Sequence, residues 1–141
     1  MKTTLFCTLQ TLNQYALGVD ATNPKSILRL KELKERKEGK YISIAVSDIH
    51  MLQEYAEVTP LAETLIRRFL PGALTLVLNG QDPGLGHLAS DGTIGVRIPD
   101  KQEALNLIKE FGKPITATSA NISGALTGSA PKEILRQFGK K

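Results

Sequence analysis

Short apolar runs alternate with amphipathic stretches along most of this chain, and that alternation constrains the fold more than any other feature. Residues 42–46, 73–78, 93–98 and 114–118 are rich in aliphatic and β-branched side chains, which predicts strands. Residues 4–12 lean the same way and predict an opening strand. We therefore expect an α/β fold with one twisted open sheet and flanking helices, although this pattern does not decide between parallel and mixed pairing.

The helix boundaries carry recognisable signals. Asn23 and Thr59 each stand before a proline, so each is expected to cap a helix whose first residue is that proline. Gly39 is expected to end the first of these helices, and Asp100 with Glu103 has the spacing of a capping box. The expected helices cover residues 24–39, 48–55, 60–70 and 100–111, and a last one starts at residue 131.

Length and composition set the outer limits. A chain of 141 residues is expected to form a single domain over residues 1–141, and 41% hydrophobic with 23% charged residues is ordinary for a soluble globular protein. No window approaches the run of about 18 apolar residues that a membrane helix needs, so no membrane partner is expected. The single Cys7, without a recognisable secretion signal, predicts a reducing, cytoplasmic location.

The segment from Pro114 to Gly124 passes from a β-branched run into a loop of small hydroxyl, amide and glycine residues. Such a loop at the carboxyl end of a strand suits a phosphate or nucleotide, because small side chains leave backbone N–H groups accessible and Ser119 and Asn121 add short polar groups. An ordinary turn has the same composition, so the loop alone leaves both interpretations open.

A basic segment upstream supports the nucleotide interpretation. Lys34, Arg36 and Lys40 together carry enough charge to neutralise a triphosphate. A run of Lys, Arg and Glu is also typical of a solvated helix face, which is the alternative for this segment. The net charge of +4 is compatible with ATP, tRNA or another acidic partner.

These two segments, together with three others, resemble those of a known family. Lys34-x-Arg36 with Lys40, followed by Ser119-x-Asn121, is similar to the KxR…SxN signature of the YrdC/Sua5/TsaC family of L-threonylcarbamoyladenylate synthases. Residues 15–22 resemble its YGLGxDA segment, residues 68–78 its RFxPGxxTxxL block and residues 92–100 its TVGVRxPD block. The resemblance extends over about residues 11 to 135, with the blocks in order.

The resemblance implies a fold, a reaction and partners. The fold is the mixed, open α/β sheet of the YrdC/RibB type. The reaction joins L-threonine, bicarbonate and ATP into threonylcarbamoyl-AMP and pyrophosphate for the N6-threonylcarbamoyladenosine modification of tRNA. ATP would be a substrate with Mg²⁺ on its phosphates. Further partners that the resemblance allows are tRNA or double-stranded RNA and other tRNA-modification proteins.

The family's site residues carry over by position. The ATP-binding positions would be Lys34, Arg36, Lys40, Thr93, Ser119, Asn121 and Thr127. The threonine-binding positions would be Asn13, Arg97 and Ala117. No side chain is assigned as a general acid or base, and no metal ligand is assigned.

Arg97 and Ser119 have alternatives in the sequence itself. Arg97 lies in a strand made otherwise of aliphatic residues, so it either faces solvent or binds an anion. A serine-hydrolase role for Ser119 is disfavoured, because the segment lacks the G-x-S-x-G elbow and neither His50 nor His87 has a suggestive context.

The chain also departs from the family's pattern. Residues 10–14 replace its PTDT segment, so Asn13 stands where a threonine contacts the amino-acid substrate. Relative to that pattern the chain is shortened at both ends. Three hypotheses therefore remain from the sequence: the synthase, a non-catalytic YrdC-like protein that binds double-stranded RNA or tRNA, and a degenerate domain kept for protein interaction.

Overall fold

The computed structural model describes residues 7–11, 14–37, 39–86, 88, 91–128 and 130–139, and of residues 7–11 it describes the backbone. The strands are β1 (Cys7–Thr11), β2 (Gln14–Gly18), β3 (Ser43–Ala45), β4 (Leu76–Asn79), β5 (Thr93–Arg97) and β6 (Ile115–Ser119). The helices are α1 (Pro24–Leu33), α2 (Ile49–Tyr55), α3 (Pro60–Phe69), α4 (Gln102–Phe111) and α5 (Pro131–Phe138), with a 3₁₀ turn η1 (Pro83–Leu85).

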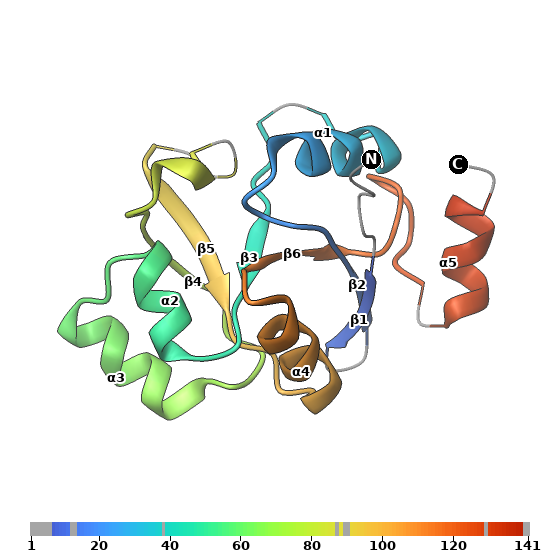
Figure 1. The fold of residues 1–141 in the computed structure, drawn as a ribbon. Helices are drawn as coiled ribbons and strands as arrows, with labels where there is room; N and C mark the ends of the chain where they lie inside the picture. Colours follow the sequence, from blue (N-terminus) through green and yellow to red (C-terminus); the bar gives the residue numbers. More distant parts are fainter. Residues whose placement is uncertain are drawn as a thin grey trace.

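The strands form one open, mixed sheet in the order β1-β2-β6-β3-β5-β4 (Figure 1). β6 lies inside the sheet and pairs antiparallel with both β2 and β3. β3 and β5 are parallel, whereas β4 returns antiparallel to β5. The α/β class with a mixed open sheet is therefore confirmed.

The two faces of the sheet are covered unequally. One face contributes Leu17, Ile44 and Val96 to the larger core cluster, which also contains Leu30 of α1 and Leu52 of α2. The opposite face contributes a smaller cluster in which Ala16, Ala45 and Ile115 pack against Ala104 and Ile108 of α4. Figure 1 shows α1 and α4 on opposite sides of β6. Because successive side chains of a strand alternate between faces, β2 and β3 each contribute to both clusters.

Local sequence signals set several helix starts. The side chain of Asn23 accepts from the N–H of Lys25, and that of Thr59 accepts from the N–H of Ala62, so both expected caps are confirmed. Asp48 caps α2 in the same way through the N–H of Met51.

The expected capping box of α4 is wrong. Lys101 is the N-cap residue and makes no side-chain capping bond. The helix thus begins one residue later than a box between Asp100 and Glu103 requires, and Glu103 falls in its first turn.

The first helix ends earlier than expected. α1 stops at Leu33, with Lys34 as its C-cap, and Glu35 takes a left-handed conformation with φ 51°. The N–H of Arg36 donates to Lys31 O at 2.9 Å and that of Glu35 donates to Glu32 O at 3.0 Å, which is the bonding of a Schellman turn. Gly39, which was expected to end the helix, lies in the following loop. The early turn directs Lys34 and Arg36 toward the end of β6.

Candidate functional site

Lys34 is buried against the segment that follows β6. Its side chain is 1% exposed. The Nζ donates to Ser119 O, to Asn121 O at 2.7 Å and to Asn121 Oδ1 at 3.3 Å. Burial, with a smaller effect from the charge of Arg36, lowers the pKa of the Lys34 ammonium from 10.5 to about 8. Two parts of the predicted signature, 85 residues apart, are thus in direct contact.

Arg36 lies next to Lys34 and is half-buried. Its Nη1 donates to Thr118 Oγ1 at 3.1 Å and its Nη2 donates to Tyr41 O. Its Nε is buried and has no hydrogen-bond partner among the residues that the structure describes. Burial lowers the pKa of the guanidinium, which still remains charged at neutral pH. Arg36 therefore joins the loop before β3 to β6, and its Nε bonds to none of the described residues.

The loop after β6 is more self-contained than the sequence suggests. The N–H groups of residues 120–123 and 125 donate to protein acceptors, among them Tyr15 O, Lys34 O and Gln137 Oε1. The expectation that these backbone groups are accessible to a phosphate is therefore wrong for those five positions, because oxygens of the protein, both within the loop and distant from it, satisfy them.

The side chains of that loop are arranged differently. Ser119 is exposed and its hydroxyl donates to Asn121 Oδ1. Asn121 is buried, and its Nδ2 donates to Ala125 O at 2.7 Å. Ser119 is thus the part of the Ser119-x-Asn121 motif that faces outward, whereas Asn121 holds the loop together.

Arg97 is held on the sheet face that α4 covers only in part. It pairs in register with Ala45, and its Nε and Nη2 donate to Thr75 Oγ1 at 3.1 and 2.7 Å. Burial lowers the pKa of its guanidinium. Of the two alternatives for Arg97, free exposure to solvent does not hold, because the side chain is half-buried.

Strand register brings two more predicted positions, Thr93 and Ala117, to the same face. Thr93 lies four residues before Arg97 on β5, and two-residue alternation gives both side chains one direction. Ala117 pairs with Ser43 on β3. A Cβ at Gly95 would lie 2.8 Å from Ser43 Oγ, so Ser43 and Gly95 are direct neighbours on this face.

The remaining predicted residues lie at the margin. Lys40 is exposed in the loop before β3, and Thr127 is half-buried in the loop before α5. Asn13 lies outside the described residues. Sequence reasoning missed Thr75, Thr118 and Ser43. Thr75 carried a signal, since it is the threonine of the block at residues 68–78.

The charges of this site are unbalanced. The ion pairs of the described residues join Arg67 to Glu63 at 2.7 Å and Lys113 to Asp20 at 3.8 Å. Within the same part of the chain, no carboxylate pairs with Lys34, Arg36 or Arg97. Buried cations without acidic partners are costly, and an anionic ligand would supply the missing charge.

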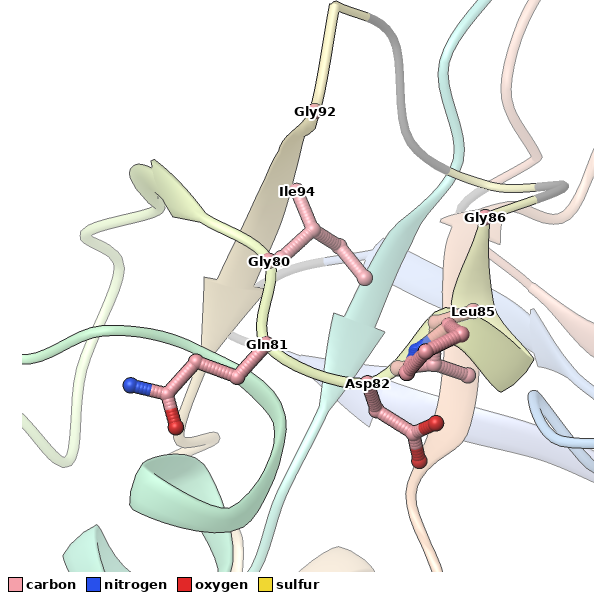
Figure 2. Close-up of a pocket in the computed structure, with 8 residues that line it drawn as sticks. Gly80, Gln81, Asp82, Leu85, Gly86, Gly92 and Ile94 are labelled. Atoms are coloured by element: carbon pink, nitrogen blue, oxygen red, sulfur yellow. The ribbon is translucent and has the colours of Figure 1, made fainter.

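A separate cavity lies on the far side of β5. It has a volume of about 220 Å³ and is lined by residues 80–83, 85–86, 92 and 94 (Figure 2). Ile94 belongs to the larger core cluster and points away from the face that carries Thr93 and Arg97. No predicted site residue lines this cavity.

The described ranges contain neither a cluster of metal ligands nor a membrane-spanning helix. No group of three or more His, Cys, Asp or Glu side chains there could hold a metal ion. The helices of those ranges are all too short or too polar to cross a membrane.

The chain is similar in sequence to several known proteins. The model of the Sua5_yciO_yrdC family, whose description reads "Telomere recombination", matches residues 7–141. A threonylcarbamoyl-AMP synthase of Bacillus subtilis is 39% identical over 113 residues, which are 78% of this chain and 33% of that protein. A relative from Methanocaldococcus jannaschii is 36% identical over 138 residues, which are 97% of this chain and 63% of the relative.

A solved structure agrees with the fold. The crystal structure of P. abyssi Sua5 complexed with L-threonine superimposes with a TM-score of 0.84 at 31% identity, covering 93% of this chain and 39% of that one. The chain thus spans less than two thirds of these longer relatives.

Proposed function

Because the chain belongs to the Sua5/YciO/YrdC family, we propose that it makes threonylcarbamoyl-AMP and pyrophosphate from L-threonine, bicarbonate and ATP. The product would serve the N6-threonylcarbamoyladenosine modification of tRNA. In reaction class this is a nucleotidyl transfer, and the single cysteine is compatible with a reducing, cytoplasmic setting.

One observation carries the proposal. Arg36 and Arg97 are half-buried cations that no carboxylate of the described residues neutralises, and they belong to the two predicted parts of one site. Lys34 and Arg36 lie at the end of β6 beside Ser119. Arg97 and Ala117 lie on the face of the sheet that also carries Ser43 and Ala45. A triphosphate and an amino-acid carboxylate are two anions that would fit these two parts.

The chemistry needs alignment more than a strong nucleophile. The threonine amine attacks CO₂ with loss of a proton, or bicarbonate with loss of water, to give a carbamate. A carbamate oxygen then attacks the α-phosphorus while pyrophosphate leaves. Both steps build negative charge, which cationic side chains stabilise. Arg36 and Lys40 would contact the phosphates, and Thr93, Ser119 and Thr127 the nucleotide.

The amino acid would bind on the sheet face. Arg97 would hold the threonine carboxylate, and Ala117 would line the pocket beside it. Asn13 is the third position that we assign to threonine. Thr75 would fix the plane of the Arg97 guanidinium, because two of its donors already bind that hydroxyl. Mg²⁺ would enter with ATP and neutralise charge on its phosphates.

The test is pyrophosphate release from ATP and bicarbonate, with and without L-threonine, beside a titration of ATP binding. We expect release that depends on threonine. An Arg97→Met variant should lose that dependence and keep ATP binding, whereas the control Arg67→Met, at an exposed arginine, should match the wild type.

Other outcomes separate the alternatives. ATP binding without release would contradict the synthase assignment and confine the function to nucleotide binding. Salt-sensitive binding of double-stranded RNA or tRNA without turnover would favour the non-catalytic RNA-binding protein. If neither ATP nor RNA binds, the result would favour the degenerate domain kept for protein interaction.

A further inference from the structure

Every donor of the Lys34 ammonium is already used inside the protein. An ammonium carries three N–H donors, and the Lys34 Nζ meets three oxygen acceptors, two of them backbone carbonyls and one the Asn121 side chain. The side chain is 1% exposed, so a ligand in solvent has almost no access to it.

The main chain of Lys34 is joined to the same loop. Lys34 O accepts from the N–H of Ser123 at 2.8 Å. The C-cap of α1 thus contacts the loop at Ser119, Asn121 and Ser123. Removal of the ammonium would leave the two carbonyls and the amide oxygen without this donor, in a place where water has little access.

We propose that Lys34 is a positioning residue that holds the Ser119–Asn121 segment in its ligand-binding shape and does not itself bind phosphate. This inference deepens the proposed function and replaces the expectation that Lys34 contacts ATP. The nucleotide would meet Ser119, Arg36 and Lys40, and Lys34 would act on it only through the loop.

The chemistry of the donor set explains why a lysine stands here. A compact ammonium can donate to three oxygens that converge on one point, whereas the flat guanidinium of an arginine spreads its donors in one plane. Arg36, two residues later, shows the contrasting use: it spans two separate oxygens and keeps its Nε unpaired among the described residues. The two cations of the KxR motif are therefore not equivalent.

The first experiment measures nucleotide affinity by titration calorimetry for Lys34→Met, Ser119→Ala and the double variant. Lys37→Met is the matched control, because Lys37 is an exposed lysine of the same basic segment. We expect Lys34→Met to weaken ATP and AMP by a similar factor of about tenfold, and Lys37→Met to change little. Ser119→Ala should cost several-fold alone and almost nothing in the Lys34→Met background.

If Lys34 bound phosphate directly, the affinities would change in a different way. ATP would then weaken far more than AMP, and the effects of the Lys34 and Ser119 substitutions would multiply. That result would overturn the inference. Lys34→Arg is the second variant: we expect it to resemble Lys34→Met, and wild-type affinity in Lys34→Arg would also overturn the inference, because charge alone would then suffice.

The second experiment needs no ligand. Amide hydrogen exchange of the Lys34→Met or Lys34→Arg protein should quicken at residues 119–125 and stay unchanged in α2 and α3. Unchanged exchange at residues 119–125 would refute the positioning role. If the wild type binds no ATP, the proposed function fails alone, and the exchange result still decides the role of Lys34.

Discussion

Burial of the Lys34 ammonium should make the stability of this protein rise with pH in an alkaline window. The pKa of Lys34 is about 8 in the folded chain and 10.5 as a free side chain, with burial as the larger cause and the charge of Arg36 as the smaller. Between these values the unfolded chain binds more protons than the folded chain, so stability increases as pH rises. Below about pH 8 both states carry the proton, and the cost of the buried charge is at its largest.

The magnitude follows from the two pKa values. Integration of the linkage relation from pH 7 to pH 10 gives a gain of about 2–3 kcal/mol from this one group. Other groups titrate over the same range, so the quantity to measure is the difference between wild type and Lys34→Met. Urea denaturation at pH 7, 8, 9 and 10 gives the free energy of unfolding for both proteins. The wild type should gain about 2–3 kcal/mol relative to the variant.

Two controls sharpen this test. Lys37→Met should follow the wild type, because Lys37 is exposed. Arg36→Met should move the rise toward higher pH, because the neighbouring charge is the second cause of the shift. Parallel stability curves for wild type and Lys34→Met across the whole range would refute the reasoning, since they would mean that the folded state does not discriminate against the Lys34 proton.

Three further predictions follow from the same contacts. The double variant Arg36→Met/Lys40→Met should lower ATP affinity at least tenfold in a binding titration. Lys40→Met alone should change the urea midpoint little, because Lys40 is exposed. Arg97→Lys should raise the KM for threonine in the pyrophosphate assay nearly as much as Arg97→Met. The reason is that an ammonium cannot keep the two bonds to Thr75 and still present a planar fork to a carboxylate. A wild-type KM in Arg97→Lys would contradict this. Gly95→Ala should destabilise the fold by about 1–3 kcal/mol, because its Cβ would lie 2.8 Å from Ser43 Oγ, and Ser43→Gly in the same chain should recover part of the loss in thermal unfolding.

Features set by neighbouring residues were predictable from the sequence. The capping bonds of Asn23 and Thr59 involve residues two or three positions away, so the local pattern contains them. Five of the six strands were found by their apolar runs, although β4 begins at Leu76, three residues later than expected. β2 (Gln14–Gly18) was not predicted as a strand. Mixed pairing came from the family resemblance, because strand order depends on contacts between distant segments.

Features that depend on distant contacts were missed. α1 ends at a turn in which Glu35 is left-handed, and no glycine at that position marks the turn in the sequence. This turn contacts the loop after β6 through Lys34. The N–H groups of that loop are satisfied by Tyr15 O and Gln137 Oε1, which are remote in sequence. The proposed roles in binding ATP and threonine stay predictions until variants are measured.

The cations of the basic segment differ in burial, and that difference separates their contributions in solution. Lys34 is enclosed, Arg36 is half-buried and Lys40 is exposed. Salt screens exposed charges over a Debye length of about 8 Å at physiological ionic strength and screens buried ones far less. Added salt should therefore remove most of the contribution of Lys40 to ATP affinity, part of that of Arg36 and little of that of Lys34. Titrations of Lys40→Met and Lys34→Met at low and high salt should thus diverge. Equal salt dependence of the two variants would mean that Lys34 faces the ligand through water, contrary to its enclosure by the loop.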